Sequence, residues 1–61
     1  MAVRLRIDYF RDGVKVGSVP CPGTLDDALR AVNGGMIKLD AEVARILDMD
    51  KNGKEVSVVK R

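Results

Sequence analysis

Residues 3–16 read Val-Arg-Leu-Arg-Ile-Asp-Tyr-Phe-Arg-Asp-Gly-Val-Lys-Val, and this stretch decides the fold. Up to Tyr9, apolar and polar side chains alternate with the period of two that is typical of a half-buried strand. Asp12-Gly13 tolerates the positive φ angles of a type I′ turn. We therefore predict a β-hairpin with a two-residue turn. Its register pairs Arg11 with Val14, Tyr9 with Val16 and Ile7 with Ser18.

The predicted register gives this hairpin two different faces. The inner face is apolar and consists of Val3, Leu5, Ile7, Tyr9, Val14 and Val16. The outer face collects charged residues together with two apolar ones: Arg4, Arg6, Asp8, Lys15, Phe10 and Val19. A sheet with one apolar face needs another layer to cover that face.

A helix is predicted to supply this layer. Two prolines in Pro20-Cys21-Pro22-Gly23 cannot donate to a strand ladder, so the second strand is expected to end there. Thr24 and Asp27 then have the spacing of an N-cap with an acidic capping box. An apolar stripe at helical spacing follows, formed by Leu25, Ala28, Leu29 and Val32.

The end of the helix is ambiguous in the sequence. Asn33-Gly34-Gly35 is typical of a helix end, yet Met36 and Leu39 continue the apolar stripe in phase. Each glycine inside a helix costs about 1 kcal/mol relative to alanine. We therefore expect a bend or a break near Gly34-Gly35 rather than a straight helix.

Asn52-Gly53 predicts a second hairpin. A two-residue turn pairs Leu47 with Val58, Asp48 with Ser57 and Met49 with Val56. The inner face of this hairpin is then Val43, Leu47, Met49, Val56 and Val58, and its outer face is Ala44, Ile46, Asp48, Asp50, Glu55 and Val59. A short helix capped by Asp40 is an alternative for residues 41–48, but the β-branched residues 56–59 need a strand partner and favour the hairpin.

The sequence thus predicts an α+β fold: an antiparallel sheet of two hairpins with one helix packed on one face, in the order ββαββ. Its 61 residues form one small domain. The expected core is Leu5, Ile7, Tyr9, Val16, Leu25, Leu29, Val32, Leu47, Met49, Val56 and Val58.

Three segments resemble a group of short, uncharacterised bacterial proteins of ββαββ order. They are Arg-x-Asp-Tyr-Phe-Arg-Asp-Gly at 6–13, Pro-Gly-Thr-Leu-Asp-Asp-Ala at 22–28 and Ala-Arg-Ile-Leu-Asp-Met-Asp at 44–50. The resemblance extends over essentially the whole chain and implies this architecture in a bacterial protein. It implies no functional residue.

Composition excludes several classes of function. The chain has a net charge of +2, no His and one Cys. The commonest general base, an intrachain disulfide and a multi-thiolate zinc site are therefore missing. No apolar run approaches the roughly 20 residues that a membrane span needs. We expect a cytoplasmic protein that is not an enzyme, holds no cofactor or metal and has no membrane segment.

Two local features could still take part in chemistry. Asp48, Asp50 and Asn52 match the start of an EF-hand calcium loop, but Val59 stands where that loop needs a bidentate glutamate. A turn with solvated carboxylates is the simpler interpretation, and a cation-responsive turn is the last of our hypotheses. Cys21 precedes the helix start, where a thiol pKa can fall, but it has no histidine base and more simply fills the strand–helix corner.

Our preferred hypothesis is a small non-catalytic interaction module that forms a homodimer. The predicted outer face contains the apolar residues Phe10, Val19, Ile46 and Val59, although outward sheet positions are normally polar. An apolar patch with a charged rim is typical of association surfaces, and a second copy or an unidentified protein would cover it. The alternative is weak nucleic-acid binding through the basic outer-face residues Arg4, Arg6 and Lys15, but the small net charge argues against that partner.

Overall fold

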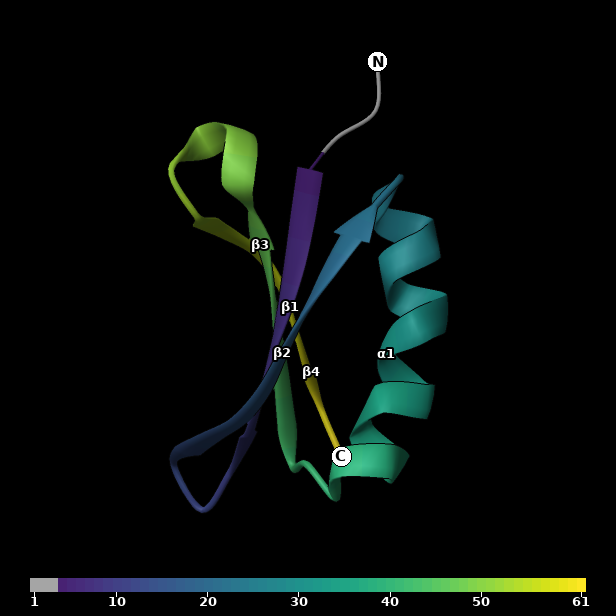
Figure 1. Cartoon of the computed structure of the whole chain (residues 1–61), viewed down its shortest axis with the longest axis vertical. Helices are drawn as coiled ribbons and strands as arrows, with labels where there is room; N and C mark the ends of the chain where they lie inside the picture. Colours follow the sequence, from purple (N-terminus) through teal and green to yellow (C-terminus); the bar gives the residue numbers. More distant parts are fainter. Residues whose placement is uncertain (1–3) are drawn as a thin grey trace.

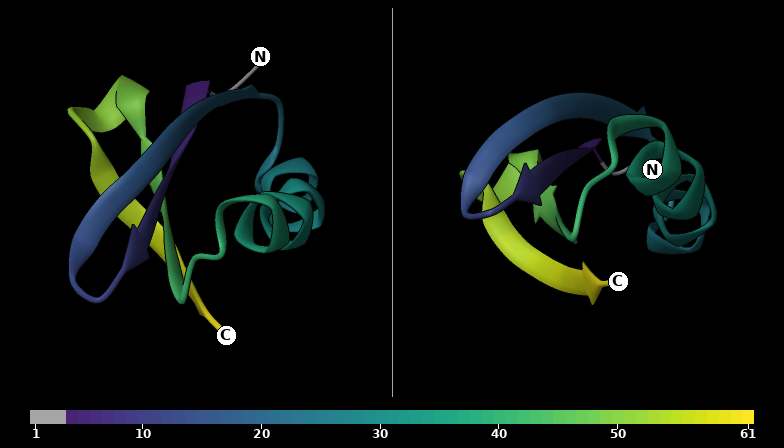
Figure 2. Two further views of the ribbon diagram at one scale, coloured as in Figure 1. Left: turned by 60° about the horizontal axis from the view of Figure 1, so that its bottom comes forward. Right: turned by 90° about the horizontal axis from the view of Figure 1, so that it is seen from below.

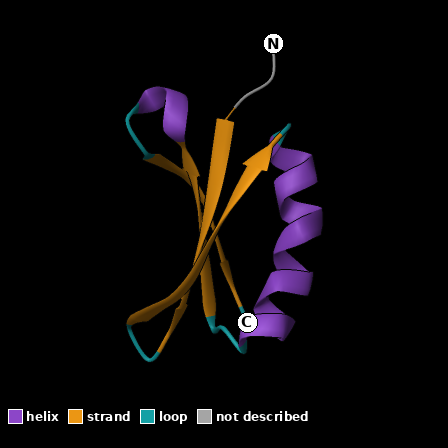
Figure 3. Ribbon diagram, viewed as in Figure 1, coloured by secondary structure: helices purple, strands orange, loops and turns teal. Residues whose placement is uncertain are grey.

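The computed structural model describes residues 4–61 and confirms the predicted α+β fold (Figures 1 and 3). In chain order the elements are β1 (Arg4–Arg11), β2 (Val14–Pro22), α1 (Leu25–Leu39), β3 (Val43–Asp48), the 3₁₀ helix η1 (Met49–Lys51) and β4 (Lys54–Lys60). The sheet has the strand order β2-β1-β3-β4, and neighbouring strands are antiparallel. Val3, which we placed on the inner face, lies outside the described residues.

α1 covers one face of the sheet. It packs against β1, β2 and β3 and leaves β4 largely uncovered (Figure 1). Because β2 and β3 are both antiparallel to β1, they run parallel to each other, and α1 crosses between them over β1. The sheet is strongly twisted and curls around the helix (Figure 2). We call the side that α1 packs on the helix face and the opposite side the open face.

α1 begins with the predicted capping box. The Thr24 hydroxyl accepts a hydrogen bond from the Asp27 amide at 3.3 Å, and the Asp27 carboxylate accepts one from the Thr24 amide at 3.1 Å. The helix ends at Asp40, which adopts a left-handed conformation with φ 52°. Hydrogen bonding to Arg61 at 2.9 Å, with the charges of Arg61 and Arg11, holds the pKa of Asp40 below its ordinary value.

The predicted bend or break at Gly34-Gly35 is wrong, because α1 continues through both residues. Gly35 lies directly above Tyr9, and a Cβ atom at Gly35 would overlap the Tyr9 hydroxyl and ring. A Cβ atom at Gly34 would meet nothing within 4 Å. Gly35 therefore lets the helix backbone approach the buried tyrosine, and this contact supports the continuous helix.

The first hairpin has the predicted turn but not the predicted register beyond it. Asp12 and Gly13 have φ angles of 53° and 78°, as a type I′ turn requires. After the pairs Arg11–Val14 and Phe10–Lys15, the register shifts, so that Tyr9 pairs with Gly17 and Ile7 with Val19. Val16 is the extra residue of a β-bulge. A Cβ atom at Gly17 would lie only 2.6 Å from Leu39, so this site leaves room for the end of α1.

Residues 43–48 form a strand, which confirms the strand alternative over the helix. Asn52 and Gly53 have positive φ angles of 59° and 78°, but η1 precedes them and the ladder closes between Asp48 and Lys54. The connection is therefore longer than the predicted two-residue turn. Asp48 caps the start of η1, because its carboxylate accepts a hydrogen bond from the Asp50 amide at 3.0 Å. Its backbone carbonyl accepts a second hydrogen bond from the Gly53 amide at 3.0 Å.

The bulge at Val16 moves Val19 to the other face of the sheet, and the second hairpin turns to the helix the face that we expected to point outward. Our placement of Val19, Ile46 and Val59 on the outer face is wrong: Val19 and Ile46 pair with Ile7, and Val59 pairs with Ala44, so all three lie on the helix face. Ile46 is fully buried. Leu47 and Val58, which we expected on the inner face, lie on the open face instead.

The buried apolar core consists of Leu5, Ile7, Tyr9, Ala28, Val32, Met36, Ala41, Ala44 and Ile46. Leu25 and Leu29 are 39% and 37% exposed, so their predicted core positions are wrong. Val56 and Val58, at 40% and 39%, are likewise exposed, and Leu47 and Met49 are only partly buried. The line of α1 that faces the sheet follows Ala28, Val32 and Met36, which leaves Leu29 on the flank of the helix. Burial, together with the nearby Cys21, raises the pKa of Tyr9.

Candidate functional site

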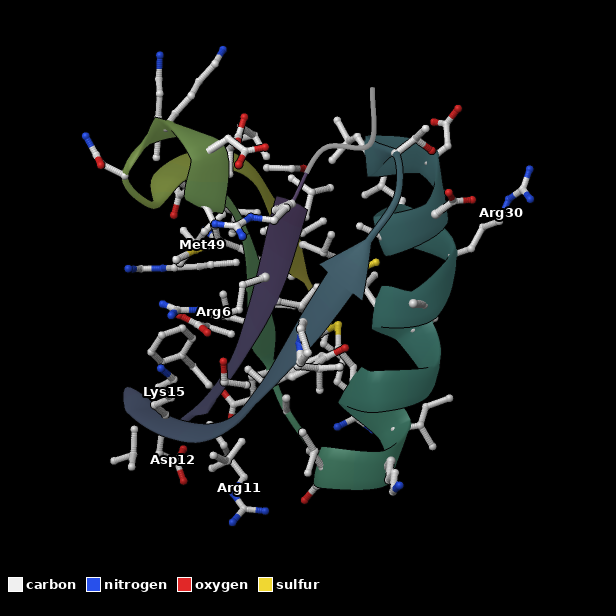
Figure 4. All side chains as sticks on the ribbon, turned by 45° about the horizontal axis from the view of Figure 1, so that its top comes forward. Arg6, Arg11, Asp12, Lys15, Arg30 and Met49 are labelled. Atoms are coloured by element: carbon white, nitrogen blue, oxygen red, sulfur yellow. The ribbon has the colours of Figure 1, made fainter. Side chains whose placement is uncertain are left out.

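The open face has no covering layer in the described part of the chain, and its side chains form three rows across the sheet. From β2 to β4 the strand registers align Lys15, Phe10, Val43 and Lys60; then Ser18, Asp8, Arg45 and Val58; then Pro20, Arg6, Leu47 and Glu55. Figure 4 shows Arg6 and Lys15 on this side, whereas Arg30 projects from the far surface of α1. The open face is therefore a surface of mixed charged and apolar residues.

Asp8 lies at the centre of the open face and is only 5% exposed. Its carboxylate accepts hydrogen bonds from the Ser18 hydroxyl at 2.8 Å and from Arg6 Nη2 at 3.2 Å, and Lys15 Nζ lies 3.6 Å away. Arg6 Nε lies 3.0 Å from Asp8 Oδ1 but is not aligned for a hydrogen bond. Burial alone would raise the pKa of Asp8, but these hydrogen bonds and the charges of Arg6 and Lys15 outweigh it and lower the pKa.

The other arginines of this face also have partners. The Arg45 guanidinium lies over the Phe10 ring, 5.1 Å from its centroid, and Arg45 Nε is 3.5 Å from the Glu55 carboxylate. Arg4 lies 3.4 Å from the Asp50 carboxylate, which also accepts the Arg4 amide at 3.2 Å. Arginine stacking on an aromatic ring is an attractive cation–π contact. Part of the Phe10 ring is therefore already in contact with a cation of the same chain.

The basic residues that we singled out for nucleic acid do share the open face. Arg4, Arg6 and Lys15 all lie on it, as the sequence predicts. Each of them is within 4 Å of a carboxylate, either Asp8 or Asp50. A phosphate would have to compete with these carboxylates, so the charge available to nucleic acid is smaller than the number of cations implies.

Of the residues predicted for the interface, only Phe10 lies on the open face. The apolar residues that accompany it there are Val43, Leu47 and Val58. Phe10, Val43 and Leu47 are half-buried, and Val58 is 39% exposed. A hollow of about 320 Å³ opens beside them and is lined by Phe10, Asp12, Gly13, Glu42, Val43 and Arg45. The period-two pattern of residues 43–47 puts Val43 and Leu47 on one side of β3, but the pattern alone does not show that this side is the open face.

The remaining candidates show no sign of a chemical site. The Asp48 carboxylate accepts a hydrogen bond from the Asp50 amide, and the Asp50 carboxylate forms an ion pair with Arg4. Within residues 4–61 there is no group of three or more His, Cys, Asp or Glu residues that could hold a metal ion. Cys21 pairs with Leu5 in the sheet and is partly buried against the core. Among the described helices, none is both long and apolar enough to cross a membrane.

A scan against protein-family models and searches of curated proteins and of solved structures found no match to this chain. The resemblance to short bacterial proteins of ββαββ order therefore stays a prediction.

Proposed function

We propose that this chain is a small, non-catalytic interaction module that forms a homodimer by packing the open faces of two copies together. The observation that carries the proposal is the position of Phe10, Val43, Leu47 and Val58 on a sheet face that nothing in residues 4–61 covers. Apolar side chains on such a face favour association, because burying them removes apolar surface from water.

The pairing of charges on the open face favours a second copy over nucleic acid. Asp8 is shared by Arg6 and Lys15, and Glu55 contacts Arg45, so the three rows keep an excess of two positive charges. Lys15 and Lys60 lie on the two edge strands, so two identical faces meet with these two lysines at the rim of the interface. A nucleic acid would gain little from cations that already have carboxylate partners.

The size of the open face sets the expected strength of the dimer. Strands about 4.8 Å apart, with about 3.3 Å per residue, give a four-stranded sheet of this length a face of roughly 400 Å². Two facing copies would then bury about 800 Å², which is below the roughly 1,200 Å² at which standard interfaces begin and is typical of weak association. We therefore expect a reversible dimer that dissociates in the micromolar range.

Sedimentation or light scattering over a wide concentration range tests this proposal. The parent should change from monomer to dimer as concentration rises, and Leu47→Lys and Val43→Lys should both remain monomeric. Ile37→Lys is the matched control, because Ile37 is apolar and 77% exposed but lies on α1, away from the open face. Circular dichroism checks that each variant is folded, and having two variants guards against one that fails to fold.

Two results would overturn the proposal. One is a parent that stays monomeric at several hundred micromolar. The other is a dimer that Ile37→Lys abolishes and the open-face variants leave intact. Retention of a monomeric parent on single-stranded DNA, lost in Arg6→Ala, would instead support nucleic-acid binding.

A further inference from the structure

The two edges of the sheet differ in how well they are protected against pairing with another strand. At one edge, β2 contains Pro20 and Pro22, which have no N–H to donate, and the bulge at Val16 disturbs its pairing. At the other edge, β4 contains no proline and includes three β-branched valines, Val56, Val58 and Val59. Proline and bulges are common ways of blocking an edge strand. The β4 edge is therefore the more open of the two.

Nothing in the described chain covers the outer side of β4. This strand pairs with β3 on one side and is the last strand of the sheet on the other. α1 packs mainly on β1, β2 and β3. The register shift beside Val56 disturbs only the start of β4, and residues 57–60 pair regularly with β3. A regular stretch of edge backbone is thus free to accept another strand.

The charges at this edge indicate what kind of strand it accepts. Lys54 and Lys60 stand at the two ends of β4, and neither forms an ion pair within residues 4–61. Glu55, the only acidic residue of β4, is already paired with Arg45. Opposite charges on adjacent strands stabilise a sheet, and like charges that face each other destabilise it.

We propose that the β4 edge binds an extended segment of another protein by strand addition, and that this segment is apolar in its centre with acidic residues at its ends. Backbone hydrogen bonds would supply the affinity, and the exposed Val56 and Val58 would contact alternate apolar side chains of the added strand. Acidic residues near Lys54 and Lys60 would fix its position along the edge.

Charge also argues against a second copy at this edge. Two β4 strands that pair antiparallel about a two-fold axis at Ser57 bring Lys54 of one copy to the same end as Lys60 of the other, with the Lys54 side chain on the helix face and the Lys60 side chain on the open face. Both ends of such a pair then carry like charges. Val58 takes part in both proposals, but the added strand binds the backbone of the β4 edge, whereas the homodimer also needs Phe10 of β1 and Val43 and Leu47 of β3.

Two matched peptides test the inference on the full chain. The acidic probe is acetyl-Glu-Val-Thr-Val-Thr-Glu-amide, and the basic probe has lysine in place of both glutamates. In an NMR titration, the acidic peptide should shift the amide resonances of residues 57–60 and should bind more tightly than the basic peptide. In the double variant Lys54→Glu with Lys60→Glu, the basic peptide should bind more tightly than the acidic one. The ratio of the two affinities should change by about tenfold, as expected for two cross-strand charge pairs.

Two controls separate strand addition from a general attraction of charges. Lys38→Glu removes an exposed lysine of α1 and should leave the preference unchanged. Two further acidic peptides carry N-methyl groups on one or the other set of alternate amides. The peptide that is methylated on the amides facing β4 should bind more weakly than the other, because it cannot donate hydrogen bonds to the β4 edge. The inference is overturned if both N-methylated peptides bind as well as the parent peptide, if the amide shifts map to Phe10, Val43 and Leu47 rather than to β4, or if no saturable binding appears at millimolar peptide.

Discussion

Replacing the adjacent glycines of α1 one at a time should change stability in opposite directions. A Cβ atom at Gly34 meets no atom within 4 Å, so Gly34→Ala adds a methyl group in open space. A Cβ atom at Gly35 overlaps the hydroxyl and ring of Tyr9, which is only 2% exposed. Intrinsic helix propensity predicts the same gain at both sites, and the structure predicts different outcomes.

The size of each effect follows from these contacts. Gly34→Ala should stabilise the protein by about 1 kcal/mol, the difference in helix propensity between the two residues. Gly35→Ala gains the same amount but forces an extra group into a packed core, which typically costs about 1–3 kcal/mol. We therefore expect a net loss at Gly35. In a domain of this size, 1 kcal/mol corresponds to a shift in melting temperature of about 4–8 °C.

Thermal unfolding followed by circular dichroism measures both variants. Gly34→Ala should melt several degrees above the parent and Gly35→Ala below it. Gly35→Ala with Tyr9→Phe should recover part of the loss, because the hydroxyl is one of the overlapping groups and the ring remains. A Gly35→Ala variant that melts at or above the parent would refute the packing of α1 on Tyr9.

Two further predictions concern the core and the open face. Ile46→Ala, at a fully buried site, should cost about 2–5 kcal/mol in chemical denaturation, and Leu29→Ala, at a 37% exposed site, should cost less than half as much. Because the pKa of Asp8 is lowered from 3.8 in the folded state, its ionisation stabilises the fold above that pH. Urea unfolding at several pH values should show Asp8→Asn less stable than the parent at neutral pH, with a difference that narrows as the pH falls below 3.8.

Features that depend on neighbouring residues could be predicted from the sequence. The Thr24–Asp27 capping box and the turn at Asp12-Gly13 form as expected, because each depends on a few adjacent residues. The side of β1 that faces the helix was also predictable, since Leu5, Ile7 and Tyr9 alternate with charged residues. The chain order of strands and helix follows from these local signals.

Strand registers depended on contacts that the sequence pattern does not contain. The bulge at Val16 places Gly17 opposite Tyr9 in the sheet. Gly17 also lies next to Leu39, the last residue of α1. Because side chains alternate along a strand, this one extra residue moves Val19 to the other face. Phe10 and Lys15 lie between the bulge and the turn, and for that reason their predicted face is correct.

β3 was assigned to the wrong face because both of its faces carry apolar residues. Its alternating pattern places Val43 and Leu47 on one side and Ala44 and Ile46 on the other, so period two alone does not select the buried side. The size of Tyr9 provides the missing discrimination. In the observed register this ring has Gly17 and Ala44 as its sheet neighbours and Gly35 above it. A large side chain surrounded by three small ones fits beneath the helix, whereas the opposite choice for β3 would place Arg45 beneath the helix and leave Ile46 exposed. Side-chain volume next to Tyr9, together with the charge of Arg45, therefore determines which residues remain on the open face for a partner.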